Sequence, residues 1–298
     1  MKKTLVAVAA LVATGAFADV TISGVFEATV ATVGGNRTVV KGTNGGSEIS
    51  FGVSEDLGNG LKAIGSSTLC FNQASGDKDW TATCGAPTAG QTASAVTSPI
   101  AHYNSYVGVS SADAGTVKIG QQFSNTFLVS GIGDTFGRAA VSNYKAGGAQ
   151  AQIANSLNYV SPSFSGVSVA YQQALDNTVA SYTSYAINYT NGALTAGYAS
   201  GKTGATTEQV FGANYDFGVA KISAGSTTST GVKTATGYGV AVPFGAVVFA
   251  VGTSSDKDGN ATQYGVTYMM SKRTSVYAAN GVKDGSPSTT LLGLRHNF

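Results

Sequence analysis

The stretch Ser288-Thr-Thr-Leu-Leu-Gly-Leu-Arg-His-Asn-Phe298 decides the fold of this chain. Successive side chains of a β-strand point to opposite faces, so a pattern with a period of two predicts a strand. Leu292, Leu294 and Phe298 share one face, and Arg295 falls on the other. The sequence stops in the middle of this half-apolar strand, which in an open sheet would leave an edge prone to aggregation. In a closed barrel the last strand pairs with the first, and the edge disappears.

The beginning of the chain predicts export. Met1-Lys-Lys3 is a short basic head, and an apolar run follows over residues 5–12. Ala16-Phe-Ala18 places small residues at the two positions that a signal peptidase reads. The apolar run is too short to span a membrane. We therefore expect a signal peptide over residues 1–18 and a single mature domain over residues 19–298.

The composition is unusual for a soluble protein. Charged residues make up 11% of the chain, against about 25% in average globular proteins. No stretch approaches the 18 or more apolar residues that a membrane-spanning helix needs. Strands that face lipid on one side and water on the other reconcile low charge with the absence of such a stretch. Lys2 and Lys3 account for the whole excess of 17 basic over 15 acidic residues. The mature chain is thus formally neutral, which argues against a nucleic-acid partner.

Cys70 and Cys84 are the two cysteines of the chain. In an exported protein, an even number of cysteines this close in sequence predicts a disulfide that closes a loop. A zinc site needs more ligands, and the two histidines, His102 and His296, have no metal-site spacing relative to the cysteines. We expect a disulfide and no metal.

Segments with alternating polarity recur from residue 20 to the last residue, at the spacing of β-hairpins. Their length suits the ~9–11 residues that a tilted strand needs to cross a bilayer. Sixteen such strands would place over half of the mature chain in sheet, which is far above the usual 20–25% and leaves a soluble β-sandwich or propeller as the alternative. The sixteen segments are 20–31, 47–54, 61–71, 101–110, 116–122, 153–160, 167–175, 181–190, 193–200, 207–216, 219–227, 234–242, 246–254, 261–270, 274–282 and 288–298.

Short and long connections alternate between these segments. The seven short ones carry the Gly, Asn, Asp or Ser residues that tight turns favour. All five prolines fall in connections, as expected because proline cannot donate to a sheet ladder. The short connections are 55–60, 111–115, 162–166, 190–192, 216–218, 243–245 and 271–274.

The parity of each strand predicts its outer and inner faces. Apolar and tyrosine side chains share one parity and suit a lipid-facing surface with interfacial aromatic residues. Most charges in the strands have the opposite parity, and charges there require water. Because sixteen strands enclose an aqueous interior, we expect a water-filled barrel. The outer set includes Val20, Ile22, Phe26, Val30, Tyr185, Ile187, Tyr189, Tyr198, Tyr264, Tyr268 and Met270, and the inner set Glu27, Glu48, Lys62, Lys118, Glu208, Lys221 and Arg295.

Enzyme and cofactor motifs find little support. The chain has no G-x-S-x-G element, which a nucleophile elbow requires. The stretch 197–203 is similar to a phosphate loop, but its spacing is one residue short and no helix is predicted after it. The stretch 256–260 is similar to a calcium loop, but it lacks the terminal Glu. We expect strand and hairpin at these two places, no cofactor, and no enzymatic activity.

Three motifs resemble the general porins of Gram-negative bacteria, especially those of β-proteobacteria. The segment 47–63 is similar to their second hairpin, and 114–122 to the strand before their constriction loop. Residues 292–298 are similar to their terminal strand. The resemblance implies an all-β, closed, 16-stranded antiparallel transmembrane barrel with short periplasmic turns and a pore-constricting third loop. It further implies a homotrimer in the outer membrane, in contact with its lipid and lipopolysaccharide, and an assembly machinery that reads Phe298.

The same resemblance assigns the third loop to residues 123–152. Fixed charges on a loop inside the barrel and on the facing wall select ions by electrostatics. Asp134 and Arg138 are the loop residues that we expect at the constriction. The wall residues that we expect to face them are Lys62, Lys118 and Arg295, with Glu48 nearby.

The chain departs from the family pattern at the constriction. Relatives often carry Arg where this chain has Glu48 and Gln121, and a basic residue where it has Gly52. Those basic residues make several relatives prefer anions, so we expect at most weak charge selectivity here. The predicted function is passive diffusion of ions and small hydrophilic solutes through an outer-membrane porin. A closed outer-membrane barrel with an adhesive or envelope-structural role is the alternative.

Overall fold

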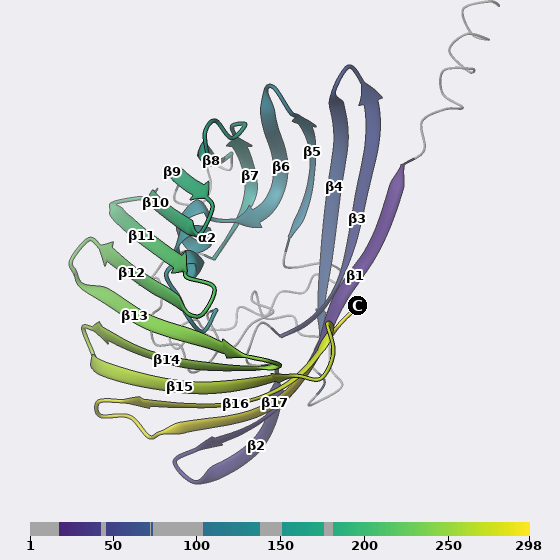
Figure 1. Cartoon of the computed structure of the whole chain (residues 1–298). Helices are drawn as coiled ribbons and strands as arrows, with labels where there is room; N and C mark the ends of the chain where they lie inside the picture. The colour runs from purple at the N-terminus through teal and green to yellow at the C-terminus, as the bar shows by residue number, and fades with distance from the viewer. Residues whose placement is uncertain (1–17, 43–45, 72, 74–103, 138–150, 176–180) are drawn as a thin grey trace, which may run out of the picture.

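A computed structural model describes residues 18–42, 46–71, 73, 104–137, 151–175 and 181–298. Seventeen antiparallel strands form one sheet that curves round on itself (Figure 1). The first strand, β1 (Asp19–Val33), pairs with the last, β17 (Thr289–Asn297), which closes the barrel. The prediction of a closed antiparallel barrel is therefore confirmed.

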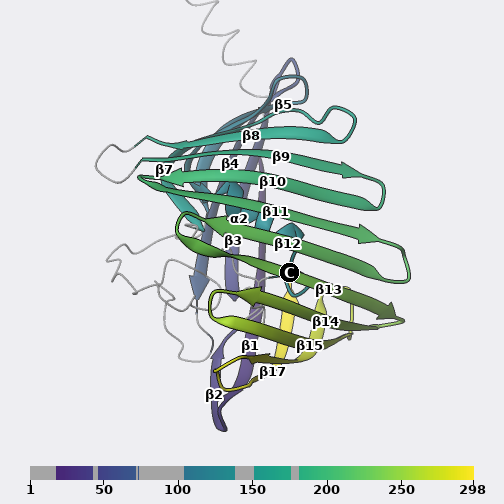
Figure 2. The same ribbon diagram turned by 90° about the vertical axis from the view of Figure 1, so that its left-hand side faces the viewer.

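All sixteen predicted segments overlap observed strands, with boundaries that differ by a few residues (Figures 1 and 2). The remaining strands are β2 (Asn36–Lys41), β3 (Ser47–Gly58), β4 (Leu61–Phe71), β5 (Ser105–Ser111), β6 (Gly115–Phe123), β7 (Gln152–Val160), β8 (Val167–Ala174), β9 (Tyr182–Asn191), β10 (Leu194–Thr203), β11 (Thr206–Asp216), β12 (Lys221–Ser229), β13 (Val232–Phe244), β14 (Val247–Asp256), β15 (Gly259–Met269) and β16 (Thr274–Lys283).

Strand β2 has no counterpart among the predicted segments. It pairs with the second half of β1, and β3 pairs with the first half of the same edge. The two strands thus occupy one position in the barrel, so seventeen strands fill sixteen positions. The hairpin between β1 and β2 turns at Gly34 and Gly35, both with positive φ, a conformation that glycine adopts without steric cost.

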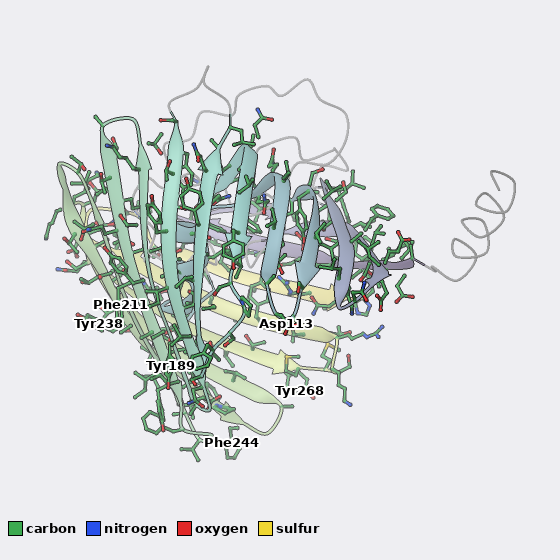
Figure 3. The ribbon with its side chains drawn as sticks, turned by 90° about the horizontal axis from the view of Figure 1, so that it is seen from above. Asp113, Tyr189, Phe211, Tyr238, Phe244 and Tyr268 are labelled. Carbon is green, nitrogen blue, oxygen red and sulfur yellow. The ribbon has the colours of Figure 1, made fainter. Side chains whose placement is uncertain are left out.

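The side chains divide into outer and inner faces as the parity predicts. On β1, Val20, Ile22 and Phe26 are exposed on the outside, whereas Glu27 and Thr29 are buried on the inside. Aromatic side chains lie on the outer face near the short turns, among them Tyr189, Phe244 and Tyr268 in Figure 3. Such residues suit a lipid interface because each ring has an apolar body and tyrosine adds a polar tip. His296 also has the outer parity, and its Nδ1 lies 2.9 Å from Thr274 Oγ1.

The short connections form tight turns at the predicted places. Gly60, Gly115, Gly166, Gly192 and Gly218 all have positive φ there. The phosphate-loop-like stretch 197–203 is part of strand β10, and the calcium-loop-like stretch 256–260 forms the β14–β15 hairpin. In the described part of the chain, no helix has the length and apolar character to cross a membrane.

Candidate functional site

A helix inside the barrel marks the candidate site. Helix α2 (Asn125–Ile132) follows β6 and lies within the curve of the sheet (Figure 1). The Ser124 hydroxyl accepts a hydrogen bond of 3.0 Å from the Phe127 amide, which satisfies one of the free N–H groups at the helix start. Gly133 ends the helix. The sequence pattern predicts the loop but no helix in it, although Ser124 is a typical N-cap residue.

Replacing Ser124 by alanine removes this cap and should cost about 1 kcal/mol of local helix stability. We expect more frequent current fluctuations in single-channel recordings, because a looser helix start lets the loop move within the pore. Ser124→Asn keeps a side-chain acceptor and should restore quiet recordings. Equal noise in Ser124→Ala and the unmodified protein would show that the cap does not hold the loop.

The helix packs against the inner wall of β8 to β11. Val129 is 1% exposed and lies among the small and branched side chains of Ala170, Ala186, Ala199 and Val210. These four wall residues come from four successive strands. The wall is therefore apolar where the helix covers it, although inner faces of such barrels are usually polar.

Glycines make room for the loop along the same wall. A Cβ atom built on Gly212 would lie 2.5 Å from the Val129 carbonyl oxygen and 2.9 Å from the Gly133 nitrogen. Both distances are shorter than a van der Waals contact, so a side chain at this position would clash with the backbone of the loop. On later strands, a Cβ on Gly252 or Gly265 would lie 3.1 and 3.0 Å from the Phe136 ring. We call the inward-facing set in contact with the loop the glycine groove: Gly197, Gly201, Gly212, Gly239, Gly252 and Gly265.

The segment after the helix continues along the wall. Asp134 Oδ1 accepts a 2.9 Å hydrogen bond from the Phe136 amide, so this carboxylate shapes its own turn. The Phe136 ring packs against the cluster of Ala31 and Leu291, on the first and last strands. Residues 124–137 thus run from the β8–β11 wall to the strands that close the barrel.

Buried polar groups hold the start of the loop. The Gln122 side-chain amide donates to the Ser156 carbonyl at 3.3 Å, and Asn125 donates to the Ser184 hydroxyl at 3.1 Å. All four residues are buried. Hydrogen bonds in such a position resist exchange with water, because a buried group that loses its partner pays its full desolvation cost.

Opposite charges meet at the seam between β1 and β17. Arg295 Nη1 donates to Glu27 Oε2 at 2.9 Å, and the Glu27 side chain is fully buried. The Tyr277 hydroxyl donates to Glu27 Oε1 at 2.6 Å and lies 2.7 Å from Thr29 Oγ1. The Tyr277 ring crosses above Gly293, where any Cβ atom would collide with it. We call Glu27, Thr29, Tyr277 and Arg295 the seam cluster.

Ser47 completes the backbone pairing of Glu27, at the break between β2 and β3. Its hydroxyl accepts from the Glu27 amide at 2.8 Å and donates to the Glu27 carbonyl at 3.0 Å. The Gly42 backbone covers the Glu27 side chain, since a Cβ there would lie 2.5 Å from its carbons. Ser47, Gly42 and the seam cluster together bury Glu27.

The other predicted constriction residues lie apart from one another. Glu48 has the inner parity on β3 and lies opposite Val25 of β1, two residues along that strand from Glu27. Lys118 Nζ lies 4.6 Å from the centre of the Tyr106 ring on β5, a cation–π arrangement. Lys62 is exposed near the short turn between β3 and β4. Arg138 lies outside the described residues, and the pore-lining role of the whole set stays a prediction.

The remaining predicted residues concern the loop disulfide and the chain end. Cys70 is the penultimate residue of β4, whereas Cys84 lies outside the described residues, so their pairing stays a prediction. The Phe298 amide and carbonyl pair with the Gly24 backbone at 3.0 and 3.1 Å. Its ring stacks on Phe26 at a centroid distance of 5.4 Å, which fixes the last residue beside the first strand.

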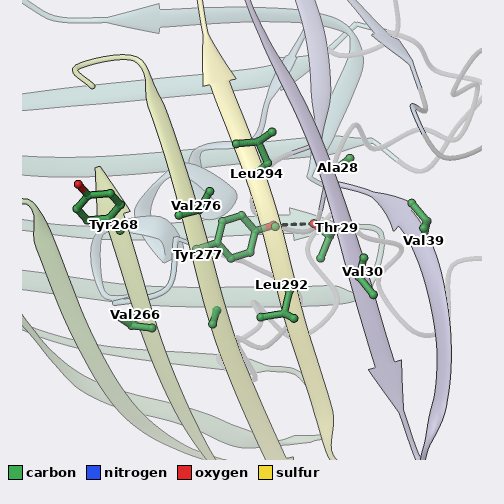
Figure 4. A pocket seen from close by; sticks show the side chains of 12 residues that line it. Ala28, Thr29, Val30, Val39, Val266, Tyr268, Val276, Tyr277, Leu292 and Leu294 are labelled. Carbon is green, nitrogen blue, oxygen red and sulfur yellow. Dashed lines mark hydrogen bonds between the residues drawn. The ribbon is translucent and has the colours of Figure 1, made fainter. Parts of the chain in front are cut away.

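The outer face beside the seam contains an apolar hollow of about 550 Å³. It lies over β1, β2 and β15 to β17, and Val39, Val276, Leu292 and Leu294 are among the side chains around it (Figure 4). Figure 4 also shows the Tyr277 ring reaching from β16 across β17 toward Thr29.

Sequence reasoning missed two parts of the site. It placed Glu27 on the inner face but did not pair it with Arg295, because the two residues are 268 positions apart. It also missed the glycine groove. Gly197, Gly201 and Gly212 share the inward parity, which could have indicated that the inner wall has no side chains at these three positions. The sequence could not show that the loop packs against them.

A closed barrel that is apolar outside, polar and charged in places inside, and narrowed by an inward loop defines a membrane channel. The sequence model of the Gram-negative porin family matches residues 4–287 of this chain. The chain therefore belongs to the Gram-negative porin family and forms an outer-membrane channel for passive diffusion.

Solved structures of porins share this fold. An anion-selective porin from Comamonas acidovorans superimposes with a TM-score of 0.74 at 21% sequence identity, over 95% of this chain and 100% of that one. A loop L8 deletion mutant of OmpT from Vibrio cholerae gives 0.73 at 16% identity, over 94% and 99%. A mutant porin from Rh. blastica gives 0.70 at 12% identity, over 94% and 100%. No match was found among curated proteins.

Proposed function

We propose that this porin is a general, trimeric diffusion channel with at most weak charge preference. The observation that carries the proposal is the distribution of charge on the inner wall. Arg295 is paired with Glu27, and Glu48 stands beside them. Lys118 lies on another part of the wall, against Tyr106. Separate charges of both signs favour neither anions nor cations strongly, in contrast to a continuous basic wall.

The mature protein would begin at Asp19, which is also the first residue of β1. Cleavage after Ala18 would thus leave no extra segment before the barrel.

The apolar hollow beside the seam supports association with further copies of this chain. An apolar surface with a recess can be covered by a partner of complementary shape, and the hollow lies on the outer face of the first and last strands.

Single-channel recording of the refolded mature protein tests this function. We expect a water-filled pore that closes in three equal steps at high voltage, one step for each subunit. In a salt gradient, the reversal potential should remain close to zero, as weak selectivity requires. A correctly inserted barrel that carries no current would contradict the diffusion function, and a large reversal potential would contradict the weak selectivity.

A further inference from the structure

We propose that Glu27 determines the ion preference of this channel by holding Arg295 in a neutral pair. This inference rests on the proposed diffusion function and names a residue that sets its selectivity. The sequence places Arg295 among the basic residues of the pore wall. The structure gives that residue a buried counter-charge, so its positive charge does not act on passing ions as a free charge would.

The geometry of the pair supports a fixed partnership. Arg295 Nη1 and Glu27 Oε2 are 2.9 Å apart, and the arginine side chain is 24% exposed against 0% for the glutamate. The partly exposed guanidinium thus lies between the interior of the barrel and the buried carboxylate. A charge-assisted hydrogen bond at this distance is among the stronger ones in proteins.

The surroundings of Glu27 keep its carboxylate in place. Tyr277 donates to the second carboxylate oxygen at 2.6 Å, and Ser47 holds the Glu27 backbone by two hydrogen bonds. The Gly42 backbone lies against the carbons of the Glu27 side chain. The Tyr277 hydroxyl and the Arg295 guanidinium thus hold the two carboxylate oxygens of Glu27 in one orientation.

The pair also changes the balance of charge on this wall. Glu27 and Arg295 cancel, so the pair adds no net charge to the wall formed by β1 and β17. Arg295, which the sequence places among the basic residues of the pore wall, therefore contributes no net positive charge at this place. Removal of Glu27 alone would release the positive charge of Arg295 toward the pore.

Reversal potentials of two variants test the proposal. In Glu27→Gln, the anion-to-cation permeability ratio should rise about twofold or more, the size expected for one unit charge that acts across roughly 10 Å of water. The double variant Glu27→Gln/Arg295→Gln should return to the ratio of the unmodified protein, because it removes both charges of the pair. An unchanged ratio in Glu27→Gln, or a shift toward cations in the double variant, would overturn the proposal.

A labelling experiment on the unmodified barrel needs no variant that might misfold. Phenylglyoxal reacts with the guanidinium nitrogens of arginine, and one of these nitrogens in Arg295 is engaged by Glu27. Arg295 should react much more slowly than Arg273, which is exposed in the turn between β15 and β16. Equal rates would overturn the pairing. A barrel that is silent in bilayers would contradict the diffusion function alone, since the labelling still tests the pair.

Discussion

Replacing Gly212 by valine should reduce the single-channel conductance to about half or less, because the loop that narrows the pore would be pushed inward. The new Cβ atom would lie 2.5 Å from the Val129 carbonyl oxygen and 2.9 Å from the Gly133 nitrogen. Both are backbone atoms and cannot turn away as the end of a side chain can. The β11 wall is held by ladders on both edges. The helix is therefore the part that moves, and the interior of the barrel is the direction open to it.

The substitution should also cost about 1–3 kcal/mol, as is usual for overpacking. Gly65→Val on β4 is the matched control, since its Cβ would have ordinary contacts, 3.6 Å from Tyr106 O and 4.0 Å from Val53 Cβ. Its conductance should equal that of the unmodified protein. Gly197→Ala should have an intermediate effect, because its nearest neighbours are the side-chain ends of Asn188 and Ile132, both at 2.9 Å. If Gly212→Val conducts normally, the glycine groove does not determine the position of the loop.

Replacing Tyr277 by phenylalanine should lower the free energy of unfolding by about 1.5–3 kcal/mol, the range for a hydrogen bond to a charged group. The hydroxyl that is removed donates to a fully buried carboxylate and contacts Thr29 on the first strand. The ring remains above Gly293, so packing is retained and the loss reports on the hydroxyl. The midpoint of denaturant-induced unfolding, followed by tyrosine fluorescence and by gel mobility without heating, measures the effect.

Tyr264→Phe makes the same chemical change on the neighbouring strand β15, where the side chain is 54% exposed on the outer face. It should leave the midpoint nearly unchanged. In a Thr29→Val background, Tyr277→Phe should cost less than in the unmodified protein if the two hydroxyls act together. Equal midpoints for Tyr277→Phe and Tyr264→Phe would show that the seam cluster contributes nothing to stability.

The fold could be predicted from the sequence because alternation and turn residues act over short distances. The run from Leu291 to Phe298 and the glycines of the short turns were sufficient to locate the strands. Strand β2 was missed, because the prediction ended the first segment at residue 31 and left residues 32–46 as a connection. Ser47 and Gly42, which flank the segment between β2 and β3, both contact Glu27 of β1, and no local pattern contains these contacts.

The candidate site was less predictable than the fold. Parity placed Glu27, Glu48 and Arg295 on the inner face, but it could not determine which charges cancel. That depends on which strands become neighbours when the barrel closes and on their register, with Glu27 opposite Arg295. The position of the loop depends likewise on the missing side chain of Gly212, whose effect is seen only when the helix lies against it.

The closure of the barrel also bears on the order in which the chain can fold. The β1–β2 hairpin joins residues that are close in sequence, whereas Glu27 meets Tyr277 and Arg295 across separations of 250 and 268 residues. Contacts with such separations form late, because the entropy of closing the intervening chain must be overcome first. The carboxylate of Glu27 consequently remains hydrated through most of assembly. Its burial coincides with the docking of the final strand, so the last step of folding removes a charge from water and supplies its partner at the same time.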